Sequence, residues 1–509
     1  MPPLDRVAGL EVALRHGSIV ATPSGNLPCA ESAAMVFTSD IFLFYFLPLT
    51  LLGYYLLPVR RRNTFLALAS YVFYGWWNPW FVLLMWASTV VDFACGLAIT
   101  APQASPRQRK QALVASVVVN LSLLGFFKYA GFFTANLNSF LGIAGFGATD
   151  LPILDVVLPV GISFYTFQSM SYSIDLYRGR ASRARSFGDF AAYVALFPQL
   201  VAGPIVRYHD LAEQLRKRSH TLDKMARGLA YFTLGFAKKV LLANNVGEIA
   251  DLVFATERPA WHLAWFGIIA YAFQIYFDFS GYSDMAIGLG WMLGFRIPQN
   301  FNSPYHANSI TDFWKRWHMS LSTWLRDYLY VPLGGNRKGR VRTYVNLALT
   351  MLLGGLWHGA QWRFIVWGAF HGLLLAAERA TSSRSLFPRA PRQVRILLTF
   401  VLVLVAWVFF RAASLGDALL YLGSMFGLLQ SVPESALLAG MVYRSFPLTI
   451  MAVAALIVVQ RRRTQDWVDD EAGSLRYSPL AATAVVLVFL LSIAELSAQS
   501  NNPFLYFQF

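Results

Sequence analysis

Long apolar stretches recur along the whole chain, separated by short connections rich in arginine and lysine. Several approach the ~20 residues that a helix needs to cross a bilayer. Other apolar runs are interrupted by Gly or Pro. The clearest stretches are residues 41–59, 80–100, 113–127, 396–410, 450–460 with the residues before them, and 481–496. The pattern predicts an all-α polytopic membrane protein with roughly 10 to 12 transmembrane helices plus re-entrant and interfacial helices.

One apolar run in the middle of the chain is broken by Pro198, Gly203 and Pro204. A broken segment at membrane depth must be buried in protein or line water, because lipid cannot satisfy its backbone. We therefore expect residues 197–204 to form a re-entrant segment.

A second segment, residues 309–330, has the pattern of an amphipathic helix. Ser309 and Asp312 have capping-box spacing at its start. Five residues at helical spacing form one mainly apolar face of this helix. They are Trp314, His318, Leu321, Leu325 and Tyr328. We expect this helix to lie at the membrane interface, with His318 facing protein or acyl chains.

The composition supports a membrane protein throughout. Of the 509 residues, 56% are hydrophobic and only 14% are charged, against roughly 25% charged in soluble domains. Mean hydropathy is +0.47. We expect residues 35–509 to form a single transmembrane domain. Residues 1–34 are polar without the apolar core of a signal peptide, so we expect a disordered leader or a misassigned start, with Met35 as the true first residue.

The formal net charge of +15 comes largely from clusters in the short connections. Such clusters are typical of cytoplasmic loops under the positive-inside rule, so we expect orientation in the cytoplasmic (inner) membrane and no nucleic-acid partner. The clusters are residues 60–62, 107–110, 178–185, 207–218, 337–342, 379–395 and 461–463.

Several function classes are excluded by missing motifs. The only cysteines, Cys29 and Cys95, cannot form a disulfide scaffold or a zinc site, and the histidines lack a recognised metal-ligand spacing, so we expect no metal. No Walker loop, HExxH or GxSxG motif is present. An ATP-driven pump, a zinc protease and a serine hydrolase are therefore disfavoured.

His358 lies in a glycine-rich apolar run, residues 352–360. An ionisable residue at membrane depth is a functional-site candidate, although a histidine there could also simply hydrogen-bond to a neighbouring helix. Gly355 with Gly359 and Gly368 with Gly372 are each four residues apart, a spacing that lets helices approach closely.

Two buried histidines would suit proton transfer. A neutral imidazole can take the proton of an alcohol as that alcohol attacks an acyl carbon. A second imidazole or an asparagine could polarise the carbonyl. This chemistry is acyl transfer from a thioester to a hydroxyl, and the residue types alone leave it one hypothesis among others.

Three further charged residues occur in apolar surroundings. Asp278 and Asp284 could cap helices at the membrane surface, or they could line a reaction chamber or orient a partner. Lys128 is expected to extend its ammonium group toward the membrane surface.

Taken in order, these motifs resemble the membrane-bound O-acyltransferase family, in its bacterial alginate-acetylating branch. The matching segments cover about residues 35 to 379. They are Met35-Val36-Phe37, Pro159 to Phe164, Gly203-Pro204-Ile205, Tyr276 to Ala286, Phe313 to His318, Ser320 to Tyr328, and Gly354 to Gly359.

The resemblance implies a helical fold with a funnel on each side of a thin central barrier. It implies that His358 is the catalytic histidine, acting as general base or as acyl relay, and that His318 supports it. It also implies that Trp317, Trp324, Asp278 and Asp284 line the chamber and contact substrate.

The resemblance also implies an O-acetyltransferase subunit with no tightly bound cofactor. Acetyl-CoA would be the cytoplasmic donor. An extracytoplasmic, esterase-like protein would accept the acetyl group and place it on a polysaccharide, with alginate as the leading candidate. Peptidoglycan, cellulose and teichoic acid are alternative polymers. A transporter or flippase with a histidine proton relay is an alternative of another class, although no internal repeat supports it.

Overall fold

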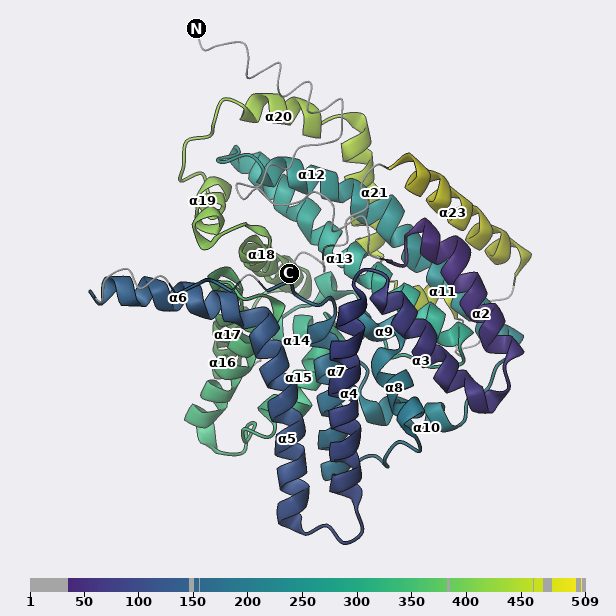
Figure 1. Cartoon of the computed structure of the whole chain (residues 1–509). Helices are drawn as coiled ribbons and strands as arrows, with labels where there is room; N and C mark the ends of the chain where they lie inside the picture. Colours follow the sequence, from purple (N-terminus) through teal and green to yellow (C-terminus); the bar gives the residue numbers. More distant parts are fainter. Residues whose placement is uncertain are drawn as a thin grey trace.

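The computed structural model describes residues 35–145, 151–154, 156–381, 385–460, 462–469, 478–499 and 505. These residues form helices joined by loops and contain no β-strand, which confirms the predicted all-α class (Figure 1). The expected leader, residues 1–34, lies outside the described residues.

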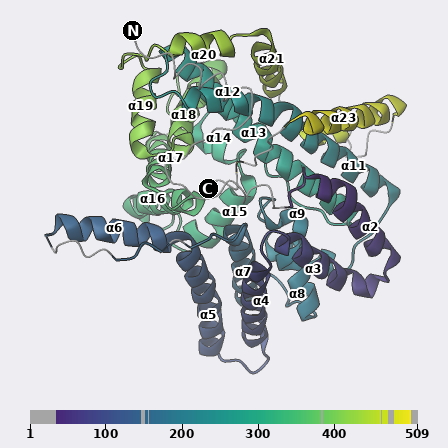
Figure 2. The same ribbon diagram turned by 45° about the horizontal axis from the view of Figure 1, so that its top comes forward.

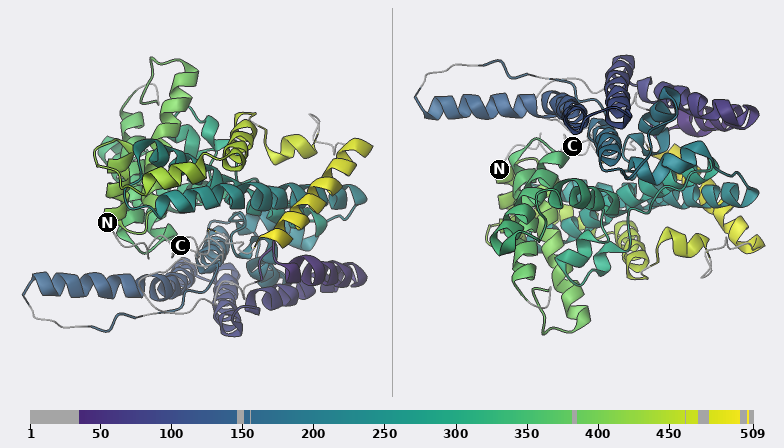
Figure 3. Two further views of the ribbon diagram at one scale, coloured as in Figure 1. Left: turned by 90° about the horizontal axis from the view of Figure 1, so that it is seen from above. Right: turned by 90° about the horizontal axis from the view of Figure 1, so that it is seen from below.

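The first third of the chain forms a layer of helices along one side of the molecule (Figure 3). Beyond the short π-helical segment η3 the chain turns away from α5, and α6 projects sideways from the body (Figure 2). The elements are η2 (Ile41–Phe46), α2 (Leu47–Leu56), α3 (Val59–Gly75), α4 (Pro79–Thr100), α5 (Pro106–Leu124), η3 (Gly125–Tyr129) and α6 (Ala130–Ile143).

The middle of the chain contains the longest helix, α13, which runs through the body of the molecule (Figure 3). The elements are α7 (Ile162–Tyr177), α8 (Phe187–Ala195), α9 (Phe197–Leu200), α10 (Tyr208–Arg216), α11 (Leu222–Ala237), η4 (Lys238–Ala243), α12 (Asn244–Phe254) and α13 (Trp261–Met292).

The remaining helices begin with short pieces that carry much of the candidate site. They are η5 (Pro304–His306), α14 (Ile310–Trp314), α15 (Met319–Leu325), η6 (Arg326–Tyr330), α16 (Gly339–His358), α17 (Trp362–Ala380), α18 (Arg392–Arg411), α19 (Leu415–Met425), α20 (Ser435–Val442), α21 (Ser445–Val459), α22 (Thr464–Val468) and α23 (Pro479–Ala498).

Five helical stretches in the described part of the chain are long and apolar enough to cross a membrane, and the bent pair α20 and α21 would make a sixth. They are Pro79–Thr100, Pro106–Ile143, Trp261–Met292, Arg392–Arg411 and Pro479–Ala498. The chain is thus a multi-pass membrane protein, with fewer long spans than the roughly 10 to 12 expected. Many apolar stretches are divided into short helices, and α16 begins with Arg340 and Arg342, which lower its hydropathy.

The broken segment around α9 is buried in protein, as predicted. Residues 196–206 are all buried. Neighbouring side chains satisfy part of its backbone, because Phe197 N–H donates to Ser70 Oγ at 3.0 Å and Ile205 N–H donates to Ser320 Oγ at 2.9 Å. The second of these bonds ties the segment directly to the start of α15.

Buried apolar side chains form two large clusters that meet near the candidate residues. Trp324 and Trp357 belong to one cluster, and Trp317 and Trp367 belong to the other. Helix α13 contributes to both, with residues up to Phe279 in one and residues from Tyr282 in the other.

Helices α16 and α17 approach closely at glycines, as the four-residue spacing predicted. A Cβ atom on Gly355 would overlap the carbonyl oxygen of Phe364 and lie 3.2 Å from Gly368 Cα. Backbone occupies that space and cannot rotate away, so an added methyl group must push the two helices apart.

Replacing Gly355 by alanine should therefore lower stability, by about 1–3 kcal/mol, as overpacking does. The thermal unfolding midpoint of the detergent-solubilised protein measures this loss. Gly440→Ala in α20 is the matched control, since no atom lies within 4 Å of its added Cβ, and a helical Gly→Ala change is worth about +0.5–1 kcal/mol. A Gly355→Ala midpoint at or above that of the wild type would contradict the close packing.

Candidate active site

His358 is the last residue of α16, and it lies inside the protein. The residue is 7% exposed, and the backbone leaves the helix at Gly359 in an extended conformation. Its ring is surrounded by aromatic side chains, with centroids 5.0 Å from Trp357, 5.2 Å from Trp367 and 5.2 Å from Phe410. An imidazole is thus held in a water-poor aromatic setting at a helix end.

His318 interrupts the amphipathic helix expected over residues 309–330. Ser309 caps the start as predicted, accepting a 3.0 Å bond from Asp312 N–H, but α14 stops at Trp314. His318 has φ +43° in the left-handed region, and α15 begins after it. The prediction of one continuous helix was wrong, because apolar residues on two short helices keep a helical spacing across the break.

Asn300 fixes this break through several hydrogen bonds. Its backbone carbonyl accepts from Met319 N–H at 2.9 Å. Its side-chain Oδ1 accepts from Ser320 N–H at 3.1 Å and from Ser320 Oγ at 2.9 Å, while its Nδ2 donates to Ser283 Oγ on α13 at 3.1 Å.

The same network assigns the tautomer of His318. Because a backbone N–H donates to Asn300 Oδ1, that atom is an oxygen and an acceptor. His318 Nδ1 lies 3.2 Å from it and must therefore be the donor. In the neutral ring the lone pair then resides on Nε2.

The two histidine rings are neighbours, with centroids 6.4 Å apart. His358 reaches this position from the end of the 20-residue helix α16, whereas His318 reaches it from a break between two short helices. Phe279 of α13 packs against His318 with centroids 4.7 Å apart. Three separate parts of the chain therefore converge on the pair.

The two predicted tryptophans pack against different sets of aromatic side chains. Trp324 stacks on Phe167 at 3.7 Å and donates Nε1–H to the Phe167 carbonyl at 3.1 Å. Phe167 in turn stacks on Trp357 at 5.5 Å. Trp317 packs instead against Phe301 and Trp407, with centroids 5.1 and 4.9 Å away.

Asp278 and Asp284 do not cap helices, since both lie in the interior of α13. Asp278 pairs with Lys239 at 2.6 Å and accepts from Leu505 N–H at 3.0 Å. Asp284 pairs with Lys238 at 2.7 Å. The capping hypothesis is wrong, and the carboxylates join α13 to η4. Phe279, the residue after Asp278, is the one that packs against His318.

Lys128 was expected to extend toward the membrane surface, but it points into the protein. Its Nζ donates to the carbonyl of Trp357 at 2.6 Å and to that of His358 at 3.2 Å. Its position in an apolar, aromatic run was the only sequence signal. The partners lie 229 and 230 residues away and could not be read from the chain.

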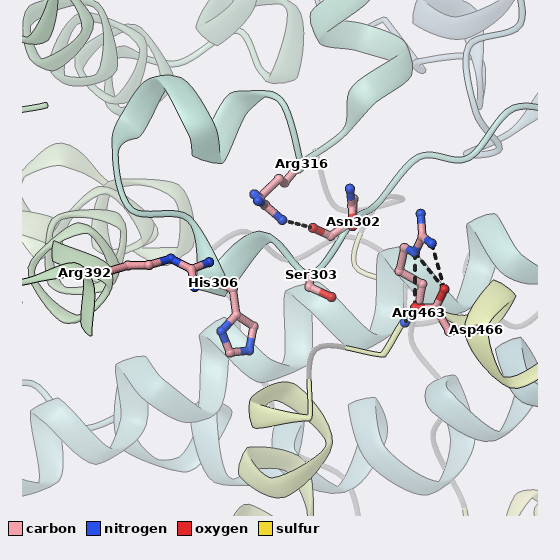
Figure 4. A pocket seen from close by; sticks show the side chains of 7 residues that line it. All are labelled: Asn302, Ser303, His306, Arg316, Arg392, Arg463 and Asp466. Carbon is pink, nitrogen blue, oxygen red and sulfur yellow. Dashed lines mark hydrogen bonds and ion pairs between the residues drawn. The ribbon is translucent and has the colours of Figure 1, made fainter. Parts of the chain in front are cut away.

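A polar cavity of 410 Å³ lies beside the segment that carries His318 (Figure 4). Asn302 N–H donates to the carbonyl of Arg316 at 2.9 Å, so the cavity wall and the His318 turn share one hydrogen-bonded loop. Its lining consists of Asn302, Ser303, His306, Arg316, Arg392, Arg463 and Asp466. Ser303 and His318 are the two non-glycine residues with positive φ in the described part of the chain.

The cavity is electropositive. Three arginines and one aspartate give it a formal charge of 3 − 1 = +2. Arg463 pairs with Asp466 at 2.7 Å, and this hydrogen bond keeps the pKa of Asp466 below its usual range, so the carboxylate stays charged. Arg316 pairs with Asp312 at 2.9 Å outside the lining. No ion pair to Arg392 is found among the described residues, which leaves its charge available to a ligand.

The described residues hold no group of three or more His, Cys, Asp or Glu side chains suited to a metal ion. What the site offers is a pair of imidazoles in aromatic surroundings and, nearby, a cluster of guanidinium groups.

Comparison with known proteins identifies relatives along nearly the whole chain. A sequence model of the membrane-bound O-acyltransferase family matches residues 180–416. The chain is 49% identical to the probable alginate O-acetylase of Azotobacter vinelandii, over 93% of this chain and 100% of the relative. It is 45% identical to that of Pseudomonas aeruginosa, with the same coverage. It is 35% identical to the peptidoglycan O-acetyltransferase of Helicobacter pylori, over 93% of this chain and 98% of the relative.

Replacing Asn300 by alanine should destabilise the protein by about 1–3 kcal/mol, because buried donors at Ser320 and His318 lose their acceptor. Thermal unfolding of the purified protein measures this. The control is Asn336→Ala, at an exposed position, where the change should stay within about 0.5 kcal/mol. Equal midpoints for the two variants would show that Asn300 does not hold the turn.

Proposed function

This chain belongs to the membrane-bound O-acyltransferase family, and we propose that it is the membrane subunit of a system that O-acetylates an exopolysaccharide. The leading polymer is alginate. The proposal is supported by two relatives named as probable alginate O-acetylases, at 49% and 45% identity over 93% of this chain. We propose that the protein is located in the cytoplasmic (inner) membrane.

The observation that carries the mechanism is the adjacent pair His358 and His318, with ring centroids 6.4 Å apart in a buried aromatic setting. We assign His358 as the catalytic base. It takes the proton of the acceptor hydroxyl as the hydroxyl oxygen attacks the thioester carbonyl carbon, a role worth about 10²- to 10⁴-fold in rate. The carbon–sulfur bond then breaks, and the leaving thiolate receives a proton.

His318 has a supporting role in this scheme. Its Nδ1–H is held by Asn300, so the ring cannot turn freely, and it would orient the neighbouring imidazole or the substrate carbonyl. If His358 instead carried the acetyl group covalently, the same ring would act as nucleophile, and an acetyl-histidine found by rapid mass spectrometry at neutral pH would reveal it. Trp317 and Trp324 would shape the chamber, whereas Asp278 and Asp284 would support it from α13.

We propose acetyl-CoA as the donor, with its phosphate groups at the electropositive cavity. Guanidinium groups bind phosphate through paired, charge-assisted hydrogen bonds. Arg392 and Arg463 belong to the basic clusters expected on the cytoplasmic side, where this donor is made. The cavity adjoins the loop that carries His318, and we propose that the acetyl group passes from there to the histidine pair.

The acetyl group would leave on the opposite side of the membrane. Helix α16 starts at Gly339, inside the basic cluster of residues 337–342, and its 20 residues are about 30 Å long. Because His358 lies at the other end of α16 from this basic cluster, we propose that it also serves an acceptor on the extracytoplasmic side. We propose that an esterase-like partner protein takes the acetyl group there and passes it to the polymer.

Peptidoglycan is the second candidate polymer, supported by the 35% identity to the Helicobacter pylori enzyme over 93% of this chain. Deleting the gene and measuring ester-linked acetate in each purified polymer separates the two. Loss from alginate alone supports the proposal, and loss from peptidoglycan alone would replace it.

Replacing His358 by alanine should abolish polymer acetylation, since it removes the imidazole proposed to take the proton of the acceptor hydroxyl. Ester-linked acetate in the purified exopolysaccharide is the measurement, with immunoblotting of membranes to confirm equal protein. His262→Ala is the matched control, because this histidine is exposed and hydrogen-bonds to Tyr443, which is exposed as well. Normal acetate content in His358→Ala would refute the assignment.

Replacing Arg392 by alanine should raise KM for acetyl-CoA by about tenfold while kcat changes little. One charge-assisted hydrogen bond is worth roughly 1.5–3 kcal/mol, and 1.4 kcal/mol corresponds to tenfold in binding. Initial rates in inverted membrane vesicles give both constants. Arg61→Ala, at an exposed position in another basic cluster, should leave KM unchanged. An unchanged KM in Arg392→Ala would place the donor elsewhere.

A further inference from the structure

The end of α16 leaves carbonyl groups that α16 itself cannot satisfy. The last four carbonyls of any helix lack intrahelical donors. Here Gly359 N–H reaches back to Gly355 O at 3.4 Å, and the chain then leaves the helix. The carbonyls of Leu356, Trp357 and His358 need partners from elsewhere, and little water is available among aromatic side chains.

Two consecutive residues of η3 donate hydrogen bonds to all three carbonyls. Tyr129 donates its hydroxyl to Leu356 O at 2.9 Å. Lys128 Nζ donates to Trp357 O at 2.6 Å and to His358 O at 3.2 Å. These bonds attach the turn that carries His358 to a segment almost 230 residues earlier in the chain.

The ammonium group of Lys128 has as many acceptor oxygens around it as it has N–H bonds. A third oxygen, Ser163 Oγ, lies 3.3 Å from Nζ, so the three N–H bonds of the ammonium have three oxygens around them. No carboxylate pairs with Lys128 among the described residues. The partial negative charge at the C-terminal end of α16 takes that place.

Lys128 lies in a π-helical turn within the long hydrophobic stretch Pro106–Ile143. A cation at membrane depth is costly, and π-helical turns occur frequently at functional sites. An apolar residue would pack in this position without that cost. The contacts show the effect of this charge, because the ammonium group hydrogen-bonds to the backbone carbonyls of Trp357 and His358.

We propose that Lys128 is a positioning residue that fixes the terminal turn of α16 and thereby orients the His358 imidazole toward His318. The inference rests on the proposed role of His358. Lys128 bonds to the backbone of His358, and the lining of the electropositive cavity does not include it. Its loss should therefore slow the chemical step without weakening donor binding.

The test is Lys128→Met, which keeps the length of the side chain and removes its three donors. With the full chain in inverted membrane vesicles and acetyl-CoA varied, kcat should fall about 10- to 100-fold, as expected for a displacement of about 1 Å. KM for acetyl-CoA should stay within about twofold of wild type. Lys128→Arg, which keeps the charge and donors, should recover part of kcat. Lys110→Met, exposed on α5, is the control.

The outcomes separate this inference from the proposed function. If His358→Ala is inactive but Lys128→Met keeps wild-type kcat, the positioning role is wrong and the proposed function stands. If His358→Ala is active, the catalytic assignment of His358 fails, and the positioning role of Lys128 fails with it. Should Lys128→Met not fold, Lys128→Leu decides, because it removes the same three donors with a shorter apolar side chain: a reduced kcat at unchanged KM supports the role, and a wild-type kcat overturns it.

Discussion

The candidate site consists of two helix ends in the interior of the protein. Each end must find hydrogen-bond partners where water is scarce. One end is the C-terminus of α16 at His358, and the other is the break between α14 and α15 at His318. Because the two helix ends lie close together, the two imidazoles are neighbours, with ring centroids 6.4 Å apart. Most of the unusual residues described above serve one of these two ends.

The partners of the two ends come from distant parts of the chain. Asn300 and Ser283 hold the turn at His318, and Lys128 with Tyr129 holds the end of α16. The left-handed backbone of His318 costs roughly 1–2 kcal/mol for a residue with a side chain. Strain of this kind persists only where surrounding bonds impose it, and it is concentrated at functional sites. Here the bonds to Asn300 impose it.

Much of the fold could be predicted from residue patterns, because those patterns depend on near neighbours. Gly355 and Gly368 indicated a close helix contact, Pro198 and Pro204 indicated a broken buried segment, and Ser309 indicated a helix start. The break at His318 could not be predicted, because the apolar spacing continues across it.

Charged residues were the hardest to interpret from sequence. Asp278 and Asp284 pair with Lys239 and Lys238, adjacent residues on a π-helical segment that no periodicity reveals. Lys128 bonds to carbonyls 229 and 230 residues away. In an apolar protein the position of a charge is decided by its partner, and the partner is fixed only by the folded chain.

The central claim is that the histidine pair transfers an acetyl group from one face of the membrane to the other. Sealed inverted vesicles given acetyl-labelled CoA on the outside test it most directly, with label recovered on acceptor inside the vesicles as the readout. The wild-type protein should deliver labelled acetyl ester to the interior, and His358→Ala at equal abundance should deliver none. Equal delivery by the two proteins would contradict the account.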